Sequence, residues 1–159
     1  MKKLYLTSAL GNYMKINGIK TSCAMDNTNC MVDKLKKICD NNTNILLIAS
    51  NPYNYAKNNN MKKIMKESFE KSKVSYNSIT IVDSRNENNL DIYLKQHQLI
   101  ILLGGHLPTQ NNWFGKLNLK NKIKSYNGYI IGQSAGSMNC ANIVYLYPEY
   151  KEELDEKAY

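Results

Sequence analysis

The sequence has no long hydrophobic run, which argues against a helical membrane protein. Its longest apolar stretches, such as Leu99 to Leu103, are far shorter than the roughly 20 residues that a membrane-spanning helix needs. The basic and apolar start, Met1 to Leu6, is interrupted by Thr7 and Ser8 before it reaches the length of a signal peptide. We therefore expect a cytoplasmic protein without a membrane partner.

Arginine is nearly absent, although the chain is basic. The 159 residues include 21 lysines and arginines against 13 acidic residues, for a net charge of +8, yet Arg85 is the one arginine. Arginine makes the bidentate contacts by which proteins commonly hold phosphates and guanines. The lysines are scattered over several expected helices. We interpret the charge as solvated helix faces and expect no nucleic-acid partner.

Cysteine and histidine occur in too sparse a pattern for a metal site. The four cysteines form no C-x-x-C pair, and the two histidines are His97 and His106. Zinc sites need closer ligand spacing, so we expect free thiols, no metal and no cofactor. We interpret Cys140 as a small buried residue of a helix and His97 as a solvated residue before a strand.

What the sequence does contain is an alternation of apolar runs and amphipathic segments. Strands are predicted at 4–6, 45–49, 78–82, 99–103 and from 128 onward, helices at 30–39, 58–72, 90–95 and 109–124, and a loop at 11–18. A continuous run such as Ile45 to Ala49 is typical of a parallel strand buried on both faces. The pattern predicts one α/β domain over residues 1–159, with a doubly wound, mostly parallel sheet and helices on both faces.

The most informative segment is Gly132-Gln133-Ser134-Ala135-Gly136, which follows the apolar run Tyr129-Ile130-Ile131. A serine between small residues at a strand-to-helix turn indicates a nucleophile elbow, with a helix expected from Ser137 to Tyr145. The N–H of Ala135 and the start of this helix would then face a developing oxyanion. The alternative interpretation is a glycine-rich turn with an ordinary helix-capping serine.

A second segment, Gly104-Gly105-His106, ends the preceding strand. In a parallel sheet it lies at the same edge as Ser134. The glycines allow close backbone approach to a ligand and can offer N–H groups to an oxyanion, or they can form a tight turn before Pro108. His106 is a candidate base, substrate contact or loop residue. Arg85, after the third strand, reaches the same edge.

Together these two segments resemble a known family. The residues from Leu103 to Asn111 (LGGHLPTQN), followed by those from Ile131 to Ser137 (IGQSAGS), are similar to the dipeptidase E (aspartyl dipeptidase) family of serine peptidases. The resemblance implies the class I glutamine amidotransferase-like fold, with Ser134 as nucleophile. It also implies oxyanion donors at Gly104, Gly105 and Ala135.

The implied substrate is a short peptide with an N-terminal aspartate, which requires a cation in the pocket. Arg85 or lysines can supply that charge. The resemblance also implies a triad acid beyond the elbow helix, and Glu149 lies at about the matching separation from Ser134. Glu149 belongs to an acidic cluster whose other interpretation is a solvated tail.

The chain departs from the family in one respect. The family's catalytic histidine follows the elbow, whereas no histidine follows His106 here. A serine hydroxyl needs a base to become a good nucleophile, so no general base is identified. We expect the 159 residues to correspond to the N-terminal two-thirds of a family member and to lack the C-terminal part of the fold. The alternative is a truncated, inactive product.

Two other function classes remain open: an esterase-type serine hydrolase and a non-catalytic binding domain. Glutamine amidotransfer is not expected, because that chemistry uses a cysteine where this chain has Ser134.

Overall fold

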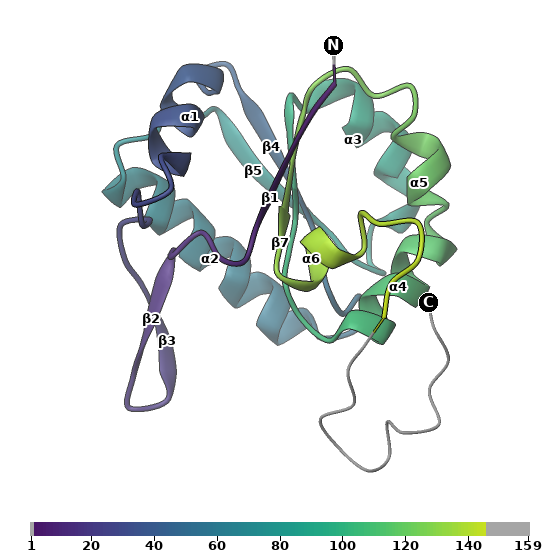
Figure 1. The fold of residues 1–159 in the computed structure, drawn as a ribbon, viewed down its shortest axis with the longest axis horizontal. Helices are drawn as coiled ribbons and strands as arrows, with labels where there is room; N and C mark the ends of the chain where they lie inside the picture. Colours follow the sequence, from purple (N-terminus) through teal and green to yellow (C-terminus); the bar gives the residue numbers. More distant parts are fainter. Residues whose placement is uncertain (1, 146–159) are drawn as a thin grey trace.

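The computed structural model describes residues 2–145 and shows a five-stranded parallel sheet (Figure 1). The strands lie in the order β1-β7-β6-β4-β5, and every neighbouring pair is parallel. Their bounds are Lys3–Thr7 for β1, Asn44–Ile48 for β4, Ser78–Val82 for β5, Leu99–Leu102 for β6 and Tyr129–Gln133 for β7. Because all five strands run in one direction, their carboxyl ends gather at one edge, where such sheets bind ligands.

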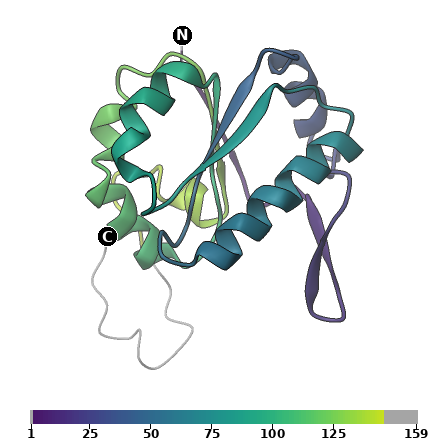
Figure 2. The same ribbon diagram turned by 180° about the vertical axis from the view of Figure 1, so that it is seen from behind.

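Helices cover both faces of this sheet, as predicted. One face carries α1 (Met31–Ile38) and α2 (Tyr55–Lys71), and the other carries α3 (Leu90–Gln96), α4 (Leu107–Lys116) and α5 (Leu119–Lys122), as Figures 1 and 2 show. The short helices η1 (Glu87–Asn89) and α6 (Ala135–Met138) precede α3 and follow β7. These layers confirm an α/β fold with a parallel sheet between helices. No helix in residues 2–145 combines the length and apolar character needed to cross a membrane.

Alternate side chains of the central strands build the two cores. In β4, Ile45 and Leu47 pack in the cluster with α1 and α2, whereas Leu46 and Ile48 pack in the cluster with α3, α4 and α5. All four side chains are fully buried, and each contributes about 2 kcal/mol through the hydrophobic effect. Burial on both faces is the physical reason why the strands appear in the sequence as continuous apolar runs.

The predicted loop at 11–18 is wrong for Tyr13–Ile16, because these residues form the first strand of a β-hairpin. Strands β2 (Tyr13–Ile16) and β3 (Ile19–Ser22) pair antiparallel and project from the body of the molecule (Figure 1, purple). The two turn residues, Asn17 and Gly18, have φ angles of 50° and 78°. Positive φ at both positions gives the turn a twist that matches the paired strands, and Asn-Gly is the residue pair that adopts it most readily.

Two predicted helices differ from the observed ones. The helix expected at 109–124 is interrupted between α4 and α5 by Asn118, which has a left-handed backbone with φ 50°. The helix expected from 137 to 145 ends at Met138. The side chain of the next residue, Asn139, donates a hydrogen bond of 3.0 Å to Gln110 of α4. The chain beyond the elbow is therefore held against α4 instead of continuing as a helix.

His97 is buried, not solvated as expected. Only 7% of the residue is exposed, and its Nδ1 lies 2.7 Å from the carbonyl oxygen of Tyr93. Burial disfavours the charged imidazolium and lowers the pKa of His97 below its ordinary value. Cys140 lies outside any helix and is half-buried against the cluster of α3, α4 and α5.

Candidate active site

Ser134 lies at the sharp turn between β7 and α6, with backbone angles φ 52° and ψ −121°. This conformation is sparsely populated by residues other than glycine and costs of the order of 1–3 kcal/mol. Such strain persists only where surrounding contacts impose it, and it concentrates at functional sites. The backbone N–H of Ser134 donates to the carbonyl oxygen of Thr7 at 2.9 Å, so the turn is anchored to β1. Ser134 is exposed, and the predicted strand-to-helix turn at this serine is confirmed.

The glycines on either side of Ser134 are required by close backbone contacts. A Cβ atom on Gly132 would lie 2.8 Å from the Cα of Ser137. A Cβ atom on Gly136 would collide with the carbonyl oxygen of Leu102 in the neighbouring strand β6. The spacing of glycine two residues before and two residues after the serine therefore follows from the steric limits of this turn.

Ser137 adds a side-chain anchor that the sequence analysis did not identify. Its Oγ lies 2.8 Å from the carbonyl oxygen of Thr7 and 2.6 Å from that of Gly132, and it accepts a hydrogen bond from the N–H of Thr7 at 3.1 Å. The hydroxyl thus ties the end of β1 to the turn that carries Ser134. A serine three residues after the nucleophile is a weak sequence signal for such an anchor. Its contact with Thr7 becomes visible only when β1 is paired with β7 in the structure.

The glycine pair after β6 lies beside Ser134. A Cβ atom on Gly104 would be 3.0 Å from the Cβ and 3.6 Å from the Oγ of Ser134, while one on Gly105 would collide with Ser50. In the described part of the chain, the backbone N–H groups of Gly104, Gly105 and Ala135 donate to no carbonyl oxygen. Gly104 lies against Ser134, Gly105 lines the same cavity and Ala135 directly follows the serine, so these three N–H groups are the candidate donors of an oxyanion hole. Their catalytic role stays a prediction.

A buried amide network holds this glycine loop in place. Gln110 is fully buried, and its side-chain amide donates to the carbonyl oxygen of Leu103. The amide of Asn139 donates to Gln110 at 3.0 Å and accepts from Asn111 at 2.8 Å. The network connects the loop after β6 with the segment after α6. The two sequence motifs are therefore one structural unit.

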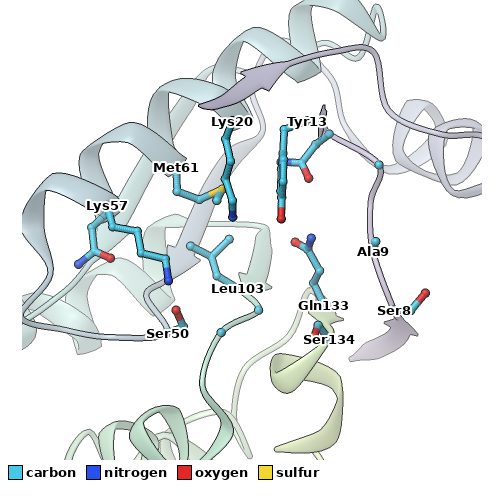
Figure 3. Close-up of a pocket in the computed structure, with 15 residues that line it drawn as sticks. Ser8, Ala9, Tyr13, Lys20, Ser50, Lys57, Met61, Leu103, Gln133 and Ser134 are labelled. Atoms are coloured by element: carbon cyan, nitrogen blue, oxygen red, sulfur yellow. The ribbon is translucent and has the colours of Figure 1, made fainter. Parts of the chain in front are cut away.

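Ser134, Gly104 and Gly105 line one cavity of about 420 Å³ (Figure 3). The other lining residues come from the segment after β1, the hairpin, the end of β4, α2 and the ends of β6 and β7. They are Ser8, Ala9, Gly11, Asn12, Tyr13, Lys20, Ser50, Lys57, Asn58, Met61, Leu103 and Gln133. The sequence analysis assigned a site role to none of these twelve residues, although Leu103 and Gln133 belong to its two motifs.

The structure does not bring the other predicted site residues to this cavity. Ala135 is buried directly after Ser134. His106 is exposed before α4, where its Nδ1 lies 2.8 Å from the hydroxyl of Thr109, and it does not line the cavity. Arg85 also lies outside the lining. Glu149 lies outside the described residues.

Arg85 has a structural partner instead of a place in the pocket. Its guanidinium contacts the carboxylate of Asp83 at 2.6 Å and the side chain of Asn59 at 2.9 Å. Burial by itself would raise the pKa of Asp83, but hydrogen bonds from Arg85 and Asn58 outweigh burial and hold that pKa below its ordinary value. Asn58 belongs to α2 and also lines the cavity, so this ion pair positions the helix that forms one wall.

Comparisons of the chain with protein-family models, with curated proteins and with solved structures gave no match. Within residues 2–145, no group of three or more histidine, cysteine, aspartate or glutamate side chains is arranged to hold a metal ion.

Proposed function

We propose that this chain carries the nucleophile of a serine hydrolase similar to dipeptidase E, with a class I glutamine amidotransferase-like fold. The proposed substrate is a short peptide with an N-terminal aspartate, cleaved through an acyl-enzyme on Ser134. The observation that carries the proposal is the strained backbone of Ser134, at φ 52°, in a cavity shared with the glycine loop after β6. A mere helix cap would not need this conformation, because capping serines adopt ordinary extended angles.

The chemistry follows from the groups around Ser134. Its Oγ attacks the carbonyl carbon of the scissile amide, and a base takes the hydroxyl proton. The N–H groups of Gly104, Gly105 and Ala135 stabilise the negative oxygen that forms. Collapse of the intermediate breaks the C–N bond, and the leaving amine takes the proton from the base. Water then attacks the ester, which releases the acid and restores Ser134.

The residues that line the cavity do not include a typical general base for this mechanism. No histidine, aspartate or glutamate of residues 2–145 lines the cavity. This observation favours a second candidate function, a non-catalytic domain that binds a ligand at the same cavity. Covalent labelling distinguishes the two, because only an activated serine reacts readily with an organophosphorus probe.

The test is labelling with a fluorophosphonate, followed by intact mass and peptide mapping. We expect a single adduct on Ser134, slow in the 159-residue chain, that is absent from Ser134→Ala. The matched control is Ser125→Ala, which removes an exposed serine far from the cavity. An adduct that maps elsewhere, or none at all, would favour the binding domain. Turnover of simple acyl esters without peptide cleavage would favour an esterase.

A further inference from the structure

The cavity beside Ser134 has a cationic wall. Lys20 of β3 and Lys57 of α2 are among its fifteen lining residues, and no lining residue is acidic. In Figure 3 both side chains extend into the cavity, Lys57 toward Ser50 and Lys20 alongside Tyr13. The ammonium of Lys20 lies 4.1 Å from the centre of the Tyr13 ring, which is close enough for a cation–π interaction that orients it.

Neither ammonium is neutralised within the described residues. Some other cations have carboxylate partners: Lys116 pairs with Glu87 at 2.8 Å and Lys122 with Asp91 at 2.5 Å. In residues 2–145 no carboxylate lies within ion-pair distance of Lys20 or Lys57. Two unpaired positive charges in a concave site concentrate anions there.

The hairpin and α2, which carry the two lysines, are joined by polar contacts. The ammonium of Lys71 in α2 donates to the carbonyl oxygen and to the hydroxyl of Ser22, both at 2.8 Å. That hydroxyl also donates to Glu67 of α2 at 2.5 Å. The register pairs Lys15 directly with Lys20 across the hairpin. Two like charges at such a position destabilise a hairpin, so Lys20 is a poor choice for stability alone.

One buried polar atom at the cavity lacks a hydrogen-bond partner among residues 2–145. Asn12 is 1% exposed and lines the cavity, and its side-chain oxygen has no hydrogen-bond donor among the described residues. The side chain of Ser50 faces the same cavity. Buried polar groups are normally satisfied, so the Asn12 oxygen is suited to accept a hydrogen bond from an amine or amide of a ligand.

We propose that Lys20 and Lys57 form a carboxylate-binding subsite, which selects substrates by charge at Ser134. This inference rests on the proposed function for the identity of the substrate, but the binding of the carboxylate is independent of catalysis. The carboxylate can come from an acidic side chain or from the free C-terminus of a short peptide. In either case the hairpin and α2 determine specificity, while the elbow and the glycine loop hold the reacting bond.

The first experiment compares two isosteric probes, succinate and succinamide, titrated into the Ser134→Ala chain at low salt. We expect succinate to bind about 10-fold more tightly, as two charge-assisted contacts imply. Lys20→Gln with Lys57→Gln should abolish this preference, and arginine at both positions should restore it. The matched control is Lys15→Gln with Lys62→Gln, which removes the same charge from the hairpin and α2 at positions that do not line the cavity. Equal binding of the two probes, or the same loss in the control, would overturn the subsite. Tighter binding of inorganic phosphate than of succinate would also overturn it.

The second experiment identifies the source of the carboxylate with four peptides and the same Ser134→Ala chain. Asp-Ala-amide carries the side-chain carboxylate alone, Asn-Ala carries the terminal one alone, Asp-Ala carries both and Asn-Ala-amide carries neither. Preferential binding of one singly charged peptide over Asn-Ala-amide, lost in the double glutamine variant, supports the subsite and names the source. Equal binding of all four contradicts it.

If fluorophosphonate labelling fails but the charge preference holds, the proposed chemistry is wrong and the subsite stands. If labelling succeeds without a charge preference, the proposed chemistry stands and the carboxylate-binding subsite is wrong.

Discussion

The two walls of the cavity are built in different ways. The elbow wall, made by β7, α6 and the loop after β6, is held by backbone contacts that leave no room for a Cβ at Gly136, and by the hydrogen bonds of Ser137. The hairpin wall belongs to a separate two-stranded sheet that exposes Met14, Ile16 and Ile19. A two-stranded hairpin is marginally stable by itself and depends on its contacts with α2. The comparison teaches that the reacting group sits on a wall held by backbone contacts, whereas Lys20 sits on a hairpin that depends on its contacts with α2.

The largest expected effect comes from Ser134 itself. Ser134→Ala should abolish covalent labelling, and in a preparation that hydrolyses aspartyl dipeptides it should reduce turnover by about a million-fold, as loss of a triad nucleophile does.

Ser134→Gly should be equally inactive but more stable than the alanine variant by about 1–2 kcal/mol, because glycine relieves the strain at φ 52°. Urea denaturation measures the second effect, and equal stabilities would show that the turn is not strained.

The next effect tests the rigidity of the elbow wall. Gly136→Ala should destabilise the fold by about 2–4 kcal/mol, because the new methyl group collides with the carbonyl oxygen of Leu102. Gly115→Ala in α4 is the matched control, since nothing lies within 4 Å of a Cβ there. That variant should gain up to about 1 kcal/mol from higher helix propensity. Similar unfolding midpoints for the two variants would contradict the comparison.

A smaller effect is expected for the anchor between β1 and the elbow. Ser137→Ala removes the hydroxyl that contacts Thr7 and Gly132 and should cost about 1–3 kcal/mol. It should also slow labelling of Ser134, because the turn loses a support. Thermal denaturation and the labelling rate are measured on the same sample. Loss of stability with an unchanged labelling rate would show that Ser137 supports the fold and not the site.

The smallest effect is expected in the hairpin wall. Gly18→Ala places a Cβ in open space, so its penalty is the backbone strain at φ 78°, about 1 kcal/mol. Because the hairpin is separate from the central sheet, we expect little change in the global unfolding midpoint but weaker binding of succinate. A loss of stability as large as that of Gly136→Ala would show that the two walls form one cooperative unit.

Much of the central sheet was predictable because the signals are local. The strand Ser78–Val82 was predicted with its observed bounds, and the others within a few residues, since buried parallel strands are short apolar runs. The elbow was predictable for the same reason, as its glycines are required by contacts within the turn and with one neighbouring strand. The hairpin was missed although Asn17-Gly18 signals it, because the flanking polar residues obscure the alternation.

The sequence by itself determined the α/β layering, the strained serine between two glycines and the placement of both motifs at the carboxyl edge of a parallel sheet. Only the tertiary structure decided which side chains share the cavity with Ser134. It brought Lys20 and Lys57 there from a hairpin and a helix, left Arg85 with Asp83, and buried His97 at the carbonyl of Tyr93. The physical reason is the sequence separation of the residues that interact. A turn or an apolar strand depends on neighbouring residues, whereas the charge of a cavity depends on long-range packing that no local pattern encodes.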